Sequence, residues 1–196
     1  MDLELVPIVK KPRVVLVHGI HAQEGTSHVR RLVPYFRDAG FDVDVFEYGW
    51  LSVLGARWRN PGIARRLAAI VEPEDHVVCH SNGAAVVWLA MRHHGMRCVQ
   101  ASLIAPALDA DKTLPGALWA DVYHNAHDHV VWAARWLWWH AWGSMGRDGA
   151  ESWDIRNIDA GNHAGLPKIA GHLAYFNEDI LPTFAPFLVE RHVRRL

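Results

Sequence analysis

Short runs of apolar residues alternate along this chain with longer segments in which apolar residues recur at helical spacing. Residues 13–17 (RVVLV) form such a run and end at His18 and Gly19, which predicts a buried strand that opens into a loop. Residues 28–39 follow, with apolar positions three and four apart and a stop at Gly40, as is typical of a helix. The chain therefore begins in the order strand, loop, helix.

The alternation continues to the end of the chain. Parallel neighbouring strands need crossover connections, so this rhythm indicates a largely parallel sheet with helices on both faces. We expect a single α/β domain over residues 1–196 with about six mainly parallel strands. Ligands bind such sheets at the carboxyl ends of the strands. The further strands are expected at residues 41–48, 76–80, 99–104, 118–123 and 153–158, and the further helices at residues 61–71, 82–94, 130–142 and 173–193.

Composition excludes several classes of protein. The 196 residues are half hydrophobic and carry a formal net charge of -1, without the basic stripe that nucleic-acid binding requires. No uncharged apolar stretch reaches the roughly 18 residues of a membrane span, and the acidic N-terminus does not resemble a secretory signal. We therefore expect a cytoplasmic protein in which Cys79 and Cys98 are buried thiols and not a disulfide.

The chemistry begins at a serine between a predicted strand and a predicted helix. The sequence Cys79-His80-Ser81-Asn82-Gly83 resembles the nucleophile elbow of the α/β-hydrolases, usually written G-x-S-x-G. Gly83 has the small size that the close approach of strand and helix demands, whereas Cys79 departs from the pattern. The alternative role for Ser81 is a helix cap.

The resemblance implies that an acid and then a histidine follow the serine along the chain. Asp128 comes just after the predicted strand 118–123, where the family has its acid loop. His172 lies in Gly-His-x-x-Tyr-Phe before the closing helix, which is similar to the ending of many small bacterial and phage α/β-hydrolases. We expect Ser81, His172 and Asp128 to form a catalytic triad. The alternative residues are Asp109, Asp111 and Asp121 for the acid and His163 for the base.

The family also implies an oxyanion hole made of two backbone N–H groups. One should come from Asn82, directly after the serine, and the other from Ile20 in the loop Val17-His18-Gly19-Ile20. A histidine at the position of His18 is usually structural in the family. The resemblance covers about residues 13–188 and leaves little room for a cap domain. It predicts a small serine esterase or lipase that cleaves a carboxylic ester or related acyl bond, with no cofactor and no metal.

Two other functions remain open from the sequence. His124, His127, Asp128 and His129 cluster in a way that is similar to metallo-β-lactamase-like hydrolases, although their spacing, H-x-x-H-D-H, does not match the H-x-H-x-D-H run of those enzymes. A hydrolase-like binding protein without activity is the third possibility. The tryptophan-rich residues 131–142 predict a helix that packs on the sheet, lines an acyl pocket or touches a lipid surface transiently. The expected partner is a small ester or acyl substrate and not a nucleic acid, and the oligomeric state is open.

Overall fold

The computed structural model describes residues 10–22, 25–134 and 142–196. Its centre is one six-stranded sheet in the order β2-β1-β3-β4-β5-β6, in which every neighbouring pair is parallel. This confirms the expected α/β fold and the parallel sheet. The strands are β1 (Arg13–Val17), β2 (Asp42–Phe46), β3 (His76–His80), β4 (Cys98–Ile104), β5 (Ala117–His124) and β6 (Ile155–Asp159).

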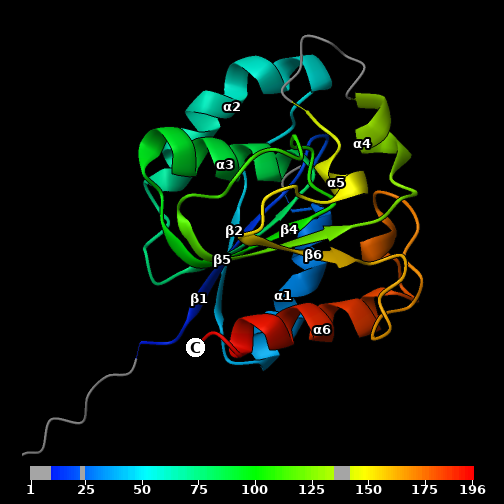
Figure 1. Cartoon of the computed structure of the whole chain (residues 1–196). Coiled ribbons are helices and arrows are strands. Elements are labelled where there is room, and N and C mark those ends of the chain that lie inside the picture. The colour runs from blue at the N-terminus through cyan, green and yellow to red at the C-terminus, as the bar shows by residue number, and fades with distance from the viewer. Residues whose placement is uncertain (1–9, 23–24, 135–141) are drawn as a thin grey trace, which may run out of the picture.

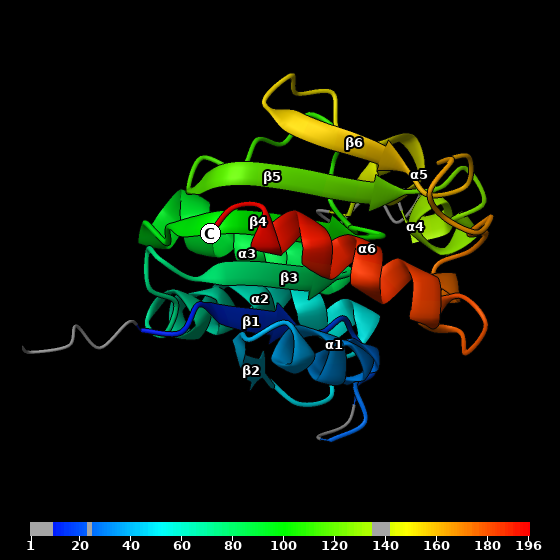
Figure 2. The ribbon, with the colours of Figure 1, turned by 90° about the horizontal axis from the view of Figure 1, so that it is seen from below.

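Helices cover both faces of the sheet, as Figures 1 and 2 show. One face packs against α2 (Val53–Ala68) and α3 (Asn82–His94), and the other against α1 (Val33–Asp38) and α6 (Leu181–Val193). Two apolar cores result, one on each side of the sheet. The shorter elements are η1 (His28–Leu32), α4 (His129–Ala134), α5 (Met145–Asp148) and η2 (Ala174–Phe176). Among the helices of the described residues, none combines the length and the apolar character needed to cross a membrane.

The strand patterns match their positions in the sheet. β3 lies inside the sheet and is buried at all five positions, as expected for its continuous apolar run. β2 lies at one edge and alternates exposed Asp42 and Asp44 with buried Val43. The sequence pattern therefore identifies central and edge strands as well as strands in general.

Several expected helix boundaries are wrong. α2 begins at Val53 and not at Pro61, because the Ser52 side chain caps it by accepting a hydrogen bond from the Gly55 N–H at 3.0 Å. Pro61 lies inside this helix, whose buried face continues on both sides of it. Packing of that face offsets the N–H that the proline lacks.

The closing helix also begins later than residue 173. Residues 174–176 form only the short 3-10 turn η2, and Asn177 is extended. α6 then starts at Leu181 with Pro182 in its first turn, a position that proline favours. Similarly, the expected helix 28–39 divides into η1 and α1, with Pro34 in the first turn of α1.

The expected helix over residues 130–142 is described only in part. α4 covers its beginning, and residues 135–141, which include Trp136 and Trp139, lie outside the described residues. The side chain of Trp132 also lies outside them. The role of the tryptophan-rich helix therefore stays a prediction.

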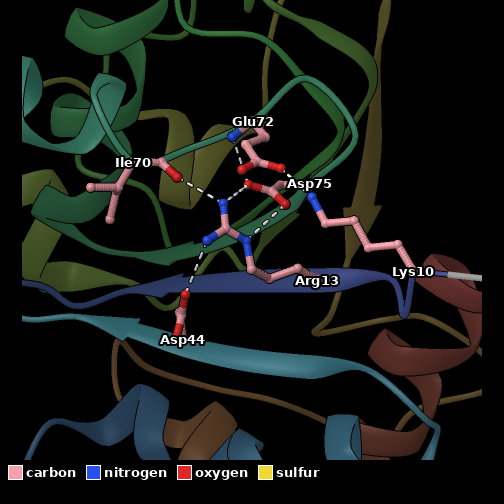
Figure 3. A network of polar contacts seen from close by, with 6 residues as sticks. All are labelled: Lys10, Arg13, Asp44, Ile70, Glu72 and Asp75. Carbon is pink, nitrogen blue, oxygen red and sulfur yellow. Dashed lines mark hydrogen bonds and ion pairs between the residues drawn. The ribbon is translucent and has the colours of Figure 1, made fainter. Parts of the chain in front are cut away.

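Ion pairs connect β1, β2 and β3 near their amino ends (Figure 3). Arg13 at the start of β1 pairs through two nitrogens with the buried carboxylate of Asp75, which directly precedes β3. The same guanidinium donates to the Ile70 carbonyl at 2.7 Å and to Asp44 of β2 at 3.2 Å. Because this network links three neighbouring strands, it fixes their alignment at the end of the sheet opposite the candidate site.

Candidate active site

Ser81 stands in a sharp turn between β3 and α3. Its backbone has φ 55° and ψ -124°, a strained conformation for a residue other than glycine. The turn is held by a hydrogen bond from the Ser81 N–H to the Ile104 carbonyl and one from the Ala107 N–H to the Ser81 carbonyl, both 3.1 Å long. A Cβ at Gly83 would lie 2.7 Å from the carbonyl oxygens of Val17 and His18, so the helix approaches the sheet closely enough to require glycine there.

Cys79 takes the place of the first glycine of the elbow pattern without disrupting the turn. It lies in regular β3 opposite Val17 and Leu103, and its side chain belongs to the core beside α2 and α3. Burial raises the pKa of its thiol well above the usual value, and Cys98 is a second free, buried thiol. Cys79 is therefore a packing residue in this turn.

The structure brings Ser81, His172 and Asp128 together. The Ser81 Oγ lies 2.8 Å from His172 Nε2, and His172 Nδ1 lies 2.8 Å from Asp128 Oδ2. Asp128 is fully buried, and its other carboxylate oxygen accepts the Val131 N–H at 3.1 Å. The Ser81 side chain makes no capping hydrogen bond to α3, so the role of helix cap is not what the geometry shows.

The alternative acids and the alternative base lie elsewhere. Asp109 and Asp111 pair with the Lys112 ammonium, and Asp121 pairs with Arg191. His163 accepts the Gly165 N–H through Nδ1, and its ring packs against Phe187. None of the contacts described for these four residues involves Ser81 or His172. The geometry therefore does not favour the four alternatives, which are Asp109, Asp111, Asp121 and His163.

Asn125 positions the loop of the candidate base, and it was not predicted from the sequence. Asn125, just after β5, is fully buried and accepts the Gly171 N–H at 3.0 Å, while its amide donates to the Gly171 carbonyl at 3.4 Å. It also donates to the Tyr175 hydroxyl at 3.3 Å. Because Gly171 precedes His172, Asn125 fixes the histidine loop to the loop that carries Asp128. An amide at a strand end, able both to donate and to accept, was the only signal in the sequence.

The two expected oxyanion donors lie beside Ser81. Asn82 is the first residue of α3, and first-turn N–H groups have no acceptor within their own helix. The Asn82 side chain is held by the Asn60 amide at 2.8 Å and the Trp142 indole N–H at 3.0 Å. Ile20 lines the same cavity as Ser81 and His172. The oxyanion hole itself stays a prediction, and both of its expected donors are close neighbours of the Ser81 turn.

His18 has a structural environment, as expected. Its ring stacks on Tyr48 with centroids 3.9 Å apart, and its Nε2 accepts the Tyr48 N–H at 3.2 Å. The Tyr48 hydroxyl donates in turn to the His18 carbonyl at 2.7 Å. Burial lowers the pKa of His18, so the imidazole is neutral near pH 7. These contacts fix the loop that carries Ile20.

The cluster proposed as a metal site is dispersed. Asp128 is bound to His172, and His124 contacts the Arg147 carbonyl at 3.2 Å. The rings of His127 and His129 lie 6.4 Å apart. Within the described part of the chain, no three histidine, cysteine, aspartate or glutamate side chains gather as metal ligands would.

Comparison with solved structures identifies the fold. No family model and no curated protein sequence matches the chain. Alpha/beta hydrolase domain-containing protein 10 from mouse superposes with a TM-score of 0.62 at 12% identity, covering 95% of this chain and 90% of that one. Dienelactone hydrolase from Anabaena variabilis gives 0.59 at 13%, covering 97% and 89%, and Paleococcus ferrophilus monoacylglycerol lipase gives 0.56 at 14%, covering 95% and 96%.

The architecture is therefore that of the α/β-hydrolases, as the elbow sequence indicated. At these identities the likeness shows the fold alone. It gives no support to the narrower expectation of a small bacterial or phage type without a cap.

Proposed function

We propose that this protein is a serine hydrolase that cleaves a carboxylic ester or a related acyl bond. The observation that carries the proposal is the continuous contact from Ser81 Oγ through the His172 ring to Asp128, located at the carboxyl ends of parallel strands. A serine hydroxyl becomes an effective nucleophile only when a base removes its proton, and this arrangement supplies that base together with a carboxylate to orient it.

The reaction proceeds through an acyl-enzyme. As Ser81 Oγ attacks the carbonyl carbon, its proton passes to His172 Nε2, and the buried Asp128 carboxylate stabilises the resulting imidazolium. The N–H groups of Asn82 and Ile20 face the negative oxygen of the tetrahedral intermediate. His172 then protonates the leaving oxygen as the carbon–oxygen bond breaks. A water molecule reverses these roles, so that one ester and one water give one acid and one alcohol.

The surroundings of Ser81 support an ester substrate. A cavity of about 360 Å³ opens at Ser81 and His172 and is lined mainly by apolar side chains, among them Val53, Ala107 and Trp142. The structural neighbours described by name as a lipase and a dienelactone hydrolase add support for hydrolysis. The two free, buried thiols agree with our proposal that the protein works in the reducing cytoplasm.

Covalent labelling tests the proposal directly. A fluorophosphonate probe should label the wild-type protein at Ser81 and leave Ser81→Ala unlabelled, because the probe reacts only with an activated serine. p-Nitrophenyl esters of graded chain length should be hydrolysed by the wild type alone. Absence of both labelling and hydrolysis would favour a binding protein without activity, and stoichiometric zinc or iron in an unlabelled but active protein would favour the metal-dependent alternative.

A further inference from the structure

A second cavity at Ser81 adjoins the apolar cavity. The two share Ile20, Val53, Ser81, Val130 and His172, so together they form one cleft with the candidate nucleophile at its junction. We call them the apolar compartment and the histidine compartment. The histidine compartment, of about 390 Å³, is lined by apolar side chains and also by polar residues from the segment after β1 and the end of β3: His18, His21, Thr26, Ser27, His28 and His80.

Beyond the residues that they share, the two compartments border different apolar side chains. The apolar compartment is bounded by Ala107, Val131 and Trp142, which belong to the core beside α2 and α3. The histidine compartment is bounded by Val29, which belongs to the core beside α1 and α6. A tetrahedral carbon bonded to Ser81 Oγ directs its acyl chain and its leaving group away from each other. The cleft therefore offers a separate space for each half of an ester.

The histidine compartment contains more polar groups than the apolar compartment but carries little charge near pH 7. Burial holds the pKa of His80 well below the usual value and also lowers that of His18. Among the described residues that line either compartment there is no lysine, arginine, aspartate or glutamate. An ionic group in the substrate would find no counter-charge there, so the lining favours an uncharged one.

Ser27 is one of the residues that line this compartment, and its hydroxyl is unused. The residue is 3% exposed, and its Oγ has no hydrogen-bond partner within the described part of the chain. Ser27 stands at the position before η1 where a serine side chain usually caps the turn, yet it makes no capping bond. A buried hydroxyl without a partner costs stability, and in a substrate cleft a ligand group can supply the missing bond.

We propose that the substrate is an uncharged ester whose apolar acyl chain occupies the apolar compartment and whose leaving group carries a hydroxyl that hydrogen-bonds to Ser27. This inference rests on the proposed function, because it assigns the two halves of the bond that Ser81 would cleave. It adds a substrate class and a specificity residue, Ser27, that lies outside the triad and the oxyanion donors.

A matched pair of substrates tests the assignment to Ser27. Propyl butanoate and 2-hydroxyethyl butanoate differ only in a terminal methyl or hydroxyl of nearly equal size. The wild type should show a kcat/KM about tenfold higher for the hydroxyethyl ester, since a site built for a hydroxyl discriminates against its absence. In Ser27→Ala the ratio should fall to about one, because the partner is gone. Ser152→Ala, at a loop serine that bonds Asp154 before β6, is the control and should keep the wild-type ratio.

A second variant tests the apolar compartment. Ala107→Leu should shift the preferred acyl chain to a shorter length, because the added side chain occupies cavity volume, and should leave the hydroxyethyl-to-propyl ratio unchanged. A wild-type ratio near one, or a ratio that Ser27→Ala leaves intact, would overturn the inference while hydrolysis itself upholds the proposed function. A changed ratio in Ala107→Leu with an unchanged chain-length optimum would show that the two halves are assigned the wrong way round. Failure to hydrolyse any ester and to react with a fluorophosphonate would overturn both proposals.

Discussion

Two serine–histidine pairs among the described residues have nearly the same hydrogen-bond lengths. At the candidate site, Ser81 Oγ lies 2.8 Å from His172 Nε2, and His172 Nδ1 contacts a carboxylate. Beneath α6, Ser102 Oγ lies 2.9 Å from His192 Nε2, and His192 Nδ1 contacts Nδ1 of His76 at 2.9 Å. On these distances alone, both Ser81 and Ser102 would be candidate nucleophiles.

Their surroundings separate them. Ser102 lies within β4 and both it and His192 are fully buried, whereas Ser81 stands on a strained turn beside a substrate-sized cavity. The Ser102–His192 pair, which we call the inner pair, contacts the neutral imidazole of His76 and not a carboxylate. A neutral imidazole cannot stabilise a protonated neighbour as the Asp128 carboxylate can. A serine–histidine contact therefore indicates catalysis only where an anion supports the histidine and a substrate can reach the serine. The inner group, which joins β3, β4 and α6, is a structural link.

Removal of the serine hydroxyl should distinguish the two serine–histidine pairs most clearly. Ser81→Ala should lower kcat/KM for p-nitrophenyl esters by a thousandfold or more, since the attacking oxygen is lost. His172→Ala should match that loss, and the double variant should be hardly worse, because members of one triad fail as a unit. Ser102→Ala is the matched control and should keep its activity while losing about 1–3 kcal/mol of unfolding free energy through the unpaired His192 nitrogen. A tenth of the activity left in Ser81→Ala, or a large loss in Ser102→Ala, would reverse the assignment.

The second largest effect should come from the carboxylate that distinguishes the two pairs. Asp128→Asn should lower kcat on the order of a thousandfold, because an amide neither stabilises the imidazolium nor holds the correct tautomer of His172. Asp121→Asn is the control: it weakens the ion pair with Arg191 and should lower the melting temperature with kcat preserved. A larger loss of kcat from Asp109→Asn or Asp111→Asn than from Asp128→Asn would place the acid after β4.

The sequence predicted the parts of this molecule that local patterns control. The limits of β1, β3 and α3 agree with their apolar runs and glycine stops, and Ser81 followed from its place between strand and helix. The start of α2 was missed because Pro61 was taken as a helix start, although packing on both sides of it decides the matter.

The contacts that depend on tertiary structure were out of reach. The inner pair joins residues 90 positions apart in the chain, and no local pattern places His192 against Ser102. Asn125 likewise reaches Gly171 only because β5 and the histidine loop meet at one edge of the sheet. Local patterns therefore gave candidate residues, and the fold decided which of them meet.

Acidification should affect the inner pair through stability. Burial lowers the pKa of His76 to about 4 and that of His192 well below its usual range, so both imidazoles are neutral in the folded protein. In the unfolded chain they bind protons below about pH 6.5, so the unfolding free energy should fall as the pH decreases from 6.5 toward 4, by up to about 1.4 kcal/mol per pH unit for each imidazole. Urea unfolding of the wild type and of His76→Asn across this range measures the effect. The variant should show a slope smaller by about one proton, and equal slopes would mean that His76 is not neutral in the fold.

The smallest effect should come from a histidine that belongs to neither pair. His163 lies in the loop after β6, only partly buried, where its Nδ1 accepts the Gly165 N–H at 3.1 Å and its ring packs against Phe187. His163→Ala removes one such local bond and one ring contact, so it should cost about 1 kcal/mol of unfolding free energy or less. The kcat for p-nitrophenyl esters should stay close to the wild-type value, since His172 already contacts both the Ser81 hydroxyl and the Asp128 carboxylate. Steady-state kinetics of His163→Ala and His172→Ala measure the difference in kcat. If the loss of kcat in His163→Ala approached the loss in His172→Ala, the catalytic base would be His163 and the assignment of His172 would be wrong.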